Sequence, residues 1–152
     1  MTITELLPPS NVVDLQGTTA AEVLFELCRP FAGAPGADPA AILEALAARE
    51  VLGSTGVGEG FAIPHARVPG LPALMASFGR SAAGINFKAA DGKPVHLFFV
   101  LAVPASATGP YLNALALVSR MFMEPDFRAA AAAAPDASTA YRLLEHESEG
   151  AK

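Results

Sequence analysis

The sequence predicts an α/β fold, a single-domain sandwich in which a mixed β-sheet is covered by helices on both faces. Segments with helical spacing of apolar residues come before, between and after segments with strand character. Residues 95–103 are apolar on both faces, which is typical of a central strand in a covered sheet. The 152 residues are 52% apolar and 16% charged, enough to bury one core. We therefore expect one domain over residues 1–152.

The N-terminal third predicts one short strand and two helices. Asn11–Leu15 has a strand-like pattern. Thr19 and Glu22 have the spacing of a capping box, and apolar residues then recur at helical intervals. The pair Asp38-Pro39 marks the start of a second helix, which we expect to end near position 49.

The middle third predicts a glycine-rich loop followed by strands. Residues 52–60 carry glycines at positions 53, 56, 58 and 60, so we expect no regular element there. Phe61–Ile63 is a short apolar strand that Pro64 stops. Longer strands are expected at Ala73–Arg80 and Val95–Val103. Ile85–Phe87 and a turn at Asp91-Gly92 predict a smaller strand and a hairpin-like connection between them.

The C-terminal third predicts three helices. Thr108 and Pro110 open the first, which carries an apolar stripe from Tyr111 to Phe122. The pair Pro125-Asp126 ends it and starts a short alanine-rich helix. Asp136 or Ser138 is expected to cap the last helix, which runs through Leu144.

Composition and charge exclude several classes of function. The net charge is −5 and no Lys/Arg cluster exists, so we expect no nucleic-acid partner. The N-terminus lacks the pattern of a signal peptide, and the apolar run at 95–103 is far shorter than the roughly twenty residues of a membrane span, so we expect no membrane insertion. The single cysteine, Cys28, fits a reducing compartment, and we expect a cytoplasmic protein. No spacing resembles a metal site, and we expect no cofactor.

The chemistry-bearing stretch is Gly53 to Arg67, in which His65 directly follows Pro64. Proline restricts its own φ and the residue before it, so the imidazole is presented by a stiff backbone. Glycine-loop N–H groups and the cations Arg49 and Arg67 are suited to bind an anion beside it. This combination is what phosphorylation of a histidine needs. We therefore expect these loop residues near the phosphate: Ser54, Thr55, Gly58 and Gly60.

Structural interpretations compete with this one. A lone histidine after a proline is often only structural or exposed. The glycine run is neither a P-loop nor a dinucleotide-binding motif, because it lacks their spacing and the P-loop lysine. His96 is interpreted as a packed or edge polar residue, His146 as solvent-exposed and Cys28 as buried filler.

The run Arg49-Glu50-x-x-Gly53-Ser54-Thr55-Gly56-Val57-Gly58-x-Gly60-x-Ala62-Ile63-Pro64-His65 resembles the active-site signature of the fructose/mannitol class of phosphotransferase-system (PTS) enzyme IIA domains. That class includes the nitrogen-regulatory (PtsN-like) proteins. The stretches Ile85–Val95 and Phe99–Val118 also resemble segments of that family. The resemblance covers roughly residues 11–144 and implies the mannitol-type enzyme IIA fold.

The resemblance implies that His65 accepts a phosphoryl group from an HPr-like carrier protein. It places Arg49 near the incoming phosphate and matches Glu59 to an acidic loop residue that orients a donor or the ring. The family usually has a second histidine at the start of the helix after the central strand, where it lies beside the acceptor and helps to hold the phosphoryl group. Here Tyr111 stands at that position, with Asn113 as the neighbouring polar candidate. A phenol cannot supply the charge of an imidazolium.

Three functional hypotheses follow. The first is a phosphocarrier of the nitrogen-regulatory type, a phosphotransferase component with a phosphohistidine intermediate and not a small-molecule enzyme; whether it counts as an enzyme stays open. The second, prompted by Tyr111, is a regulatory binding module that is not phosphorylated and controls a transporter or a sensor kinase. The third is the IIA component of a sugar transporter of the fructose/mannitol type, which would also need a membrane permease as partner.

Overall fold

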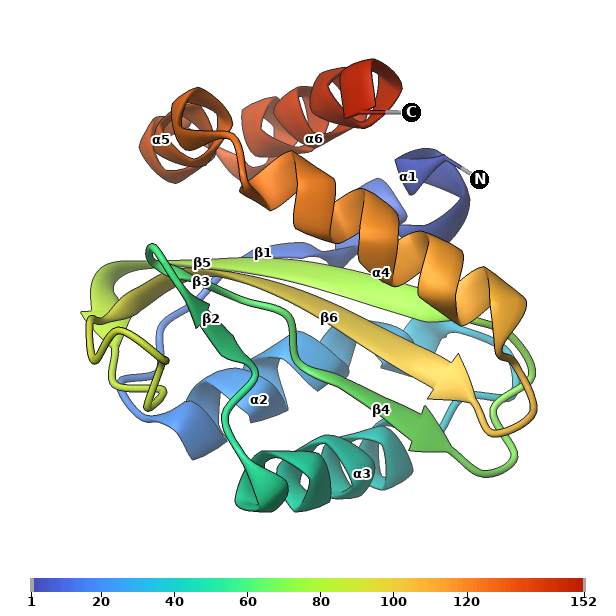
Figure 1. The fold of residues 1–152 in the computed structure, drawn as a ribbon. Helices are drawn as coiled ribbons and strands as arrows, with labels where there is room; N and C mark the ends of the chain where they lie inside the picture. Colours follow the sequence, from blue (N-terminus) through green and yellow to red (C-terminus); the bar gives the residue numbers. More distant parts are fainter. Residues whose placement is uncertain (1, 152) are drawn as a thin grey trace.

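The computed structural model describes residues 2–151, so the two ends of the predicted domain, positions 1 and 152, lie outside the described residues. The chain forms helices and six strands in a mixed sheet (Figure 1). In chain order the elements are α1 (Ile3–Leu6), η1 (Pro9–Asn11), β1 (Val12–Asp14), α2 (Ala20–Cys28), η2 (Arg29–Gly33), α3 (Pro39–Leu52), β2 (Gly56–Gly58), β3 (Phe61–Ala62), β4 (His65–Val68), β5 (Met75–Ile85), β6 (Val95–Pro104), α4 (Gly109–Phe122), α5 (Pro125–Ala133) and α6 (Ala137–Ala151).

Strand β6 is the centre of the sheet. It pairs antiparallel with β5 on one side, and β5 pairs in parallel with β1. Along its other edge β6 pairs in parallel with β3 first and then with β4, while β2 pairs antiparallel with β3. Both faces of β6 are buried, which confirms the prediction from its apolar sequence.

Successive side chains of β6 enter two different cores, because neighbouring residues of a strand point to opposite faces. Leu97, Phe99 and Leu101 pack in the core beneath α1, α4, α5 and α6. Phe98 and Val100 pack in the core beneath α2 and α3. Figure 1 shows these two helical layers above and below the sheet, so the predicted covered sandwich is confirmed.

Local signals predicted several helix starts correctly. The Thr19 side chain accepts from the Glu22 backbone N–H, and the Glu22 carboxylate accepts from the Thr19 N–H, which completes the capping box. Asp38 caps α3 through the Ala40 N–H. Asp136, not Ser138, caps α6, because its carboxylate accepts from the Thr139 N–H at 2.7 Å.

Other boundaries differ from the prediction. Helix α3 continues past position 49 to Leu52, and β5 runs to Ile85, so Asn86 and Phe87 form no separate strand. The expectation of no regular element in the glycine-rich segment was wrong, since β2 forms there with an irregular register. Gly58 makes this possible because it adopts φ 108°, which other residues rarely tolerate.

The position of His65 also differs from the prediction. The strand Phe61–Ile63 was expected to place His65 just past its end, whereas β3 ends at Ala62 and His65 is the first residue of a further strand, β4. Pro64 lies between the two strands, and its carbonyl accepts a hydrogen bond from Leu101 N–H at 2.9 Å. Both short strands use the same edge of β6.

Candidate functional site

The backbone on either side of His65 is held by hydrogen bonds. The Ile63 N–H donates to the Thr55 carbonyl at 3.1 Å, and the Pro64 carbonyl is bound to β6. His65 itself is paired with Leu101 in the parallel ladder. The half-buried imidazole is therefore presented from a fixed main chain, at the point where β4 begins.

One ring nitrogen of His65 is engaged and the other is left for chemistry. Nδ1 lies 2.6 Å from the Ile63 carbonyl oxygen. A carbonyl can only accept, so Nδ1 carries the hydrogen and donates it. In the neutral ring the lone pair then belongs to Nε2. This tautomer makes Nε2 the nucleophilic atom.

Two further predicted residues lie beside this ring. The Tyr111 ring, on the first turn of α4, lies with its centroid 6.0 Å from that of His65. The Arg67 guanidinium lies 5.5 Å from the centroid of the same tyrosine ring. Strand residues two apart share a face, so His65 and Arg67 project from the same side of β4. The structure thus brings His65, Arg67 and Tyr111 together.

Arg49 lies near the end of α3, and Ser54 and Thr55 lie in the loop that follows this helix. Arg49 Nη1 donates to the Gly53 carbonyl at 2.8 Å, across the end of α3. Ser54 Oγ donates to the Phe87 carbonyl at 2.6 Å and accepts from the Gly56 N–H at 2.9 Å. These side chains fix the loop whose next residue, Thr55, is bonded to Ile63. The Arg49 guanidinium is thus hydrogen-bonded to the loop and not to His65.

Sequence reasoning missed the residue that anchors Thr55. The Glu50 carboxylate accepts from the Thr55 backbone N–H at 3.2 Å and from its hydroxyl. Glu50 lies in the last turn of α3 and so ties that helix to the loop whose Thr55 carbonyl is bonded to Ile63. Glu50 belongs to the signature Arg49–His65, but no local pattern in the sequence indicates which group its carboxylate binds.

The structure does not bring Glu59, Gly58 and Gly60 to His65. Phe61 pairs with Leu97 of β6, whereas His65 pairs with Leu101 of the same strand. Because four residues of a strand span about 13 Å, Phe61 and His65 lie about that far apart along β6. The β2–β3 turn lies beyond Phe61, on the side of α5 (Figure 1).

Glu59 has partners in that turn. Its N–H donates to Asp91 at 2.9 Å, and its carboxylate lies 3.8 Å from Arg128. The expected role of Glu59 in orienting the ring therefore has no support from its contacts.

The remaining candidates lie apart from the site. Asn113 is exposed on α4, two residues from Tyr111 and so on a different side of that helix. His96 is half-buried, and its Nδ1 lies 2.9 Å from the Ser81 carbonyl. His146 is exposed on α6, as the sequence predicts. Burial raises the pKa of the Cys28 thiol to about 12.

Residues 2–151 contain neither a metal-binding cluster nor a membrane-spanning helix. No group of three histidine, cysteine or acidic side chains is arranged to hold a metal ion. No helix in that part of the chain has the length and hydropathy to cross a membrane.

Comparison with known proteins identifies the family. Residues 6–147 match the family described as "Phosphoenolpyruvate-dependent sugar phosphotransferase system, EIIA 2", and the chain belongs to it. A nitrogen regulatory protein of Bradyrhizobium diazoefficiens is 36% identical over 145 residues, which cover 95% of each chain. The crystal structure of nitrogen regulatory protein IIA-Ntr from Neisseria meningitidis has a TM-score of 0.87 at 35% identity, over 93% of this chain and 98% of that one.

A more distant structure agrees in fold. Enzyme IIA of the mannitol system from Escherichia coli, solved in complex with its phosphorylated enzyme IIB, has a TM-score of 0.75 at 15% identity. The alignment covers 89% of this chain and 94% of that one. The family match and the two nitrogen regulatory relatives support a phosphocarrier or regulatory role in the phosphotransferase system, of the nitrogen-regulatory type.

Proposed function

We propose that this protein is a cytoplasmic phosphocarrier of the nitrogen-regulatory type that accepts a phosphoryl group on Nε2 of His65. The donor is a phosphohistidine on an HPr-like carrier protein. The single observation that carries this proposal is the hydrogen bond from Nδ1–H to the Ile63 carbonyl, because it leaves the lone pair on Nε2.

The transfer is a displacement at phosphorus. Nε2 of His65 forms a new bond to phosphorus while the N–P bond of the donor breaks, and the electron pair of the broken bond stays on the donor nitrogen. The donor phosphohistidine carries a hydrogen on its other ring nitrogen, so its ring loses one positive charge and leaves as a neutral imidazole. The His65 ring gains positive charge, and its Nδ1–H keeps donating to Ile63, in a bond that strengthens when the donor is charged.

The test is incubation with enzyme I, an HPr-type carrier and phosphoenolpyruvate. Wild type is expected to gain one acid-labile phosphate, measured by intact mass, and His65→Ala is expected to gain none. His146→Ala is the matched control, because it removes an exposed histidine on α6 and leaves the β4 site unchanged. No phosphate on wild type, or equal labelling of His65→Ala, would refute the proposal.

A regulatory module that is never phosphorylated is the second candidate, and the phenol beside His65 is the observation that favours it. Such a module would bind a transporter or sensor kinase equally well as wild type and as His65→Ala or His65→Glu. A clear difference between the alanine and glutamate variants in partner binding would count against it, since glutamate mimics only the charge of the phosphorylated state.

A further inference from the structure

Arg67 is exposed, yet its guanidinium is held in place. Nη1 donates to the carbonyls of Ala105 and Ala107, at 3.0 and 2.9 Å. Both carbonyls belong to the connection between β6 and α4. Two bonds from one nitrogen fix the plane of the group, so Arg67 loses little further freedom when it binds a ligand.

The rest of the guanidinium is available. Among residues 2–151, no group accepts a hydrogen bond from Nε–H or from the two hydrogens of Nη2. Nε–H and the nearer hydrogen of Nη2 form the edge that matches two oxygens of a phosphate. An ordered arginine with this edge unused is suited to bind an oxyanion.

Tyr111 connects this edge to the nucleophile. Its ring lies against the Arg67 guanidinium, with 5.5 Å from Cζ to the centroid, and against the imidazole, with 6.0 Å between the centroids. His65 and Arg67 leave the same face of β4 about 7 Å apart along the strand. Two long side chains that leave one face at this spacing can both reach a group bound to Nε2.

We propose that Arg67 is the cation that binds the phosphoryl oxygens on His65, and that Tyr111 is a positioning residue that holds the guanidinium beside the ring. The inference rests on the proposed function of His65. The transferred group carries two negative charges, and Arg67 supplies a fixed positive charge and two parallel donors. Tyr111 acts through the face of its ring and not through its hydroxyl group.

Variants at the two positions distinguish the contributions of the Arg67 charge, the Arg67 donor geometry and the Tyr111 ring. Arg67→Met is expected to slow transfer from the carrier and to shorten the lifetime of phospho-His65, each by roughly 10- to 100-fold, because a charge-assisted hydrogen bond is lost. Arg67→Lys keeps the positive charge but lacks the planar pair of donors. Its transfer rate is expected to lie between those of wild type and Arg67→Met. Tyr111→Phe keeps the ring face and should match wild type, whereas Tyr111→Ala should lose transfer rate.

Two comparisons distinguish this role from a merely structural one. The double variant Arg67→Met/Tyr111→Ala is expected to be no slower than Arg67→Met alone, because Tyr111 acts through Arg67. Arg29→Met is the matched control, since Arg29 is also exposed and its guanidinium lies 5.9 Å from the centroid of Phe25. Arg29 follows α2, which covers the other face of the sheet (Figure 1). Urea unfolding of each variant shows whether a slow variant is simply unfolded.

A titration with inorganic phosphate tests the anion site without any carrier protein. Phosphate is expected to shift the Nε–H signal of Arg67 in the NMR spectrum of wild type, with no shift of the Arg29 signal. Transfer by a folded Arg67→Met at the wild-type rate, or no response of Arg67 to phosphate, would overturn the inference. If wild type accepts no phosphoryl group but Arg67 responds to phosphate, the proposed function fails and the anion site stands.

Discussion

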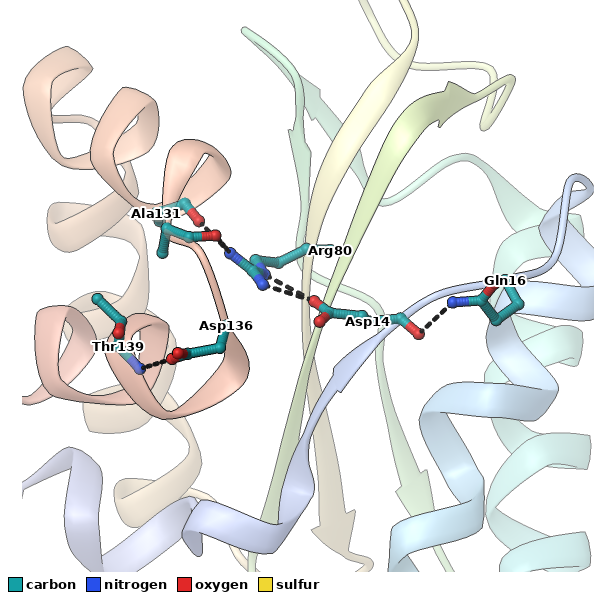
Figure 2. A network of polar contacts seen from close by, with 7 residues as sticks. Asp14, Gln16, Arg80, Ala131, Asp136 and Thr139 are labelled. Carbon is teal, nitrogen blue, oxygen red and sulfur yellow. Dashed lines mark hydrogen bonds and ion pairs between the residues drawn. The ribbon is translucent and has the colours of Figure 1, made fainter.

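Arg80 donates from both Nε and Nη2 to one carboxylate oxygen of Asp14, at 2.9 and 2.7 Å, and so joins strand β5 to strand β1 (Figure 2). Its third nitrogen, Nη1, donates to the carbonyls of Ala131 and Ala134 at the end of α5, at 3.1 and 2.7 Å. The Arg80 side chain is only 10% exposed. One guanidinium therefore connects the sheet to the C-terminal helices and satisfies carbonyls that the last turn of a helix leaves unpaired.

Replacing Arg80 is expected to cost stability. Arg80→Met leaves the α5 carbonyls and the Asp14 carboxylate without their donor, and we expect a loss of about 2 kcal/mol. The figure is below that of a fully buried pair because the Asp14 side chain is 51% exposed. The free energy of unfolding in urea measures it. Arg142→Met, an exposed arginine on α6, is the control and should change stability by less than about 0.5 kcal/mol. Equal stability of both variants would contradict the role given to Arg80.

Gly56 is expected to tolerate no side chain. A Cβ there would lie 2.9 Å from Cα and Cβ of Ala89 and 3.0 Å from Ser54 Oγ. Gly56→Ala therefore forces β2 away from the 86–94 connection, and we expect a loss of about 2 kcal/mol. Gly109→Ala is the control, because a Cβ at Gly109 meets nothing within 4 Å. The midpoint of urea unfolding should be lower for Gly56→Ala than for Gly109→Ala. Equal midpoints of the two variants would refute the clash.

Glu50 is expected to affect phosphorylation of His65 without touching it. Its carboxylate holds Thr55, whose carbonyl accepts from Ile63. Glu50→Ala removes this anchor, so we expect about 1 kcal/mol of lost stability and several-fold slower labelling of His65 by the carrier. Glu44→Ala, an exposed glutamate on the same helix, should label like wild type. Labelling of Glu50→Ala at the wild-type rate would show that the anchor does not position His65.

The sequence predicts most of the fold because its strongest signals are local. A capping box at Thr19 and the apolar run of β6 each specify one element within a few residues. Strand β4 carries no such signal, since His65, Ala66 and Arg67 show no apolar alternation. It exists because β6 offers an unpaired edge past the end of β3. Pairing between segments distant in sequence therefore decided this element.

The same distinction applies to the candidate site. His65 and Arg67 are two residues apart on one strand, so their common face follows from local geometry. Tyr111 reaches them only through the tertiary placement of α4, which the family resemblance predicted and spacing could not. Glu59 is close to His65 in sequence, but the β2–β3 turn directs it towards Arg128. Glu59 and His65 are therefore neighbours in the sequence motif but not in the folded protein.

The acid dependence of stability is expected to include a contribution from Asp91. Its carboxylate accepts from the N–H groups of Glu59 and Lys93, and these bonds lower the pKa of Asp91 below its ordinary value of 3.8. A lowered folded-state pKa stabilises the protein above the unfolded pKa, and this contribution disappears as the pH falls through the folded pKa. Asp91→Asn should therefore be less stable than wild type at neutral pH and approach it in acid. A stability difference that stays constant down to about pH 3 would contradict this assignment.

Cys28 is expected to be chemically inert in the folded protein. Its thiol is 2% exposed in the core beneath α2 and α3, and burial raises its pKa to about 12. The thiolate is the reactive form, so a disulfide reagent should label the native protein only as fast as the chain opens, and rapidly in urea. The raised pKa also means that stability falls as the pH rises above the ordinary thiol pKa of 9.0, because only the unfolded chain then ionises readily. Cys28→Ala should remove both the labelling and this part of the alkaline loss of stability. Fast labelling of the native protein at neutral pH would show that the thiol is reachable and that the packing of α2 against α3 is looser than the structure describes.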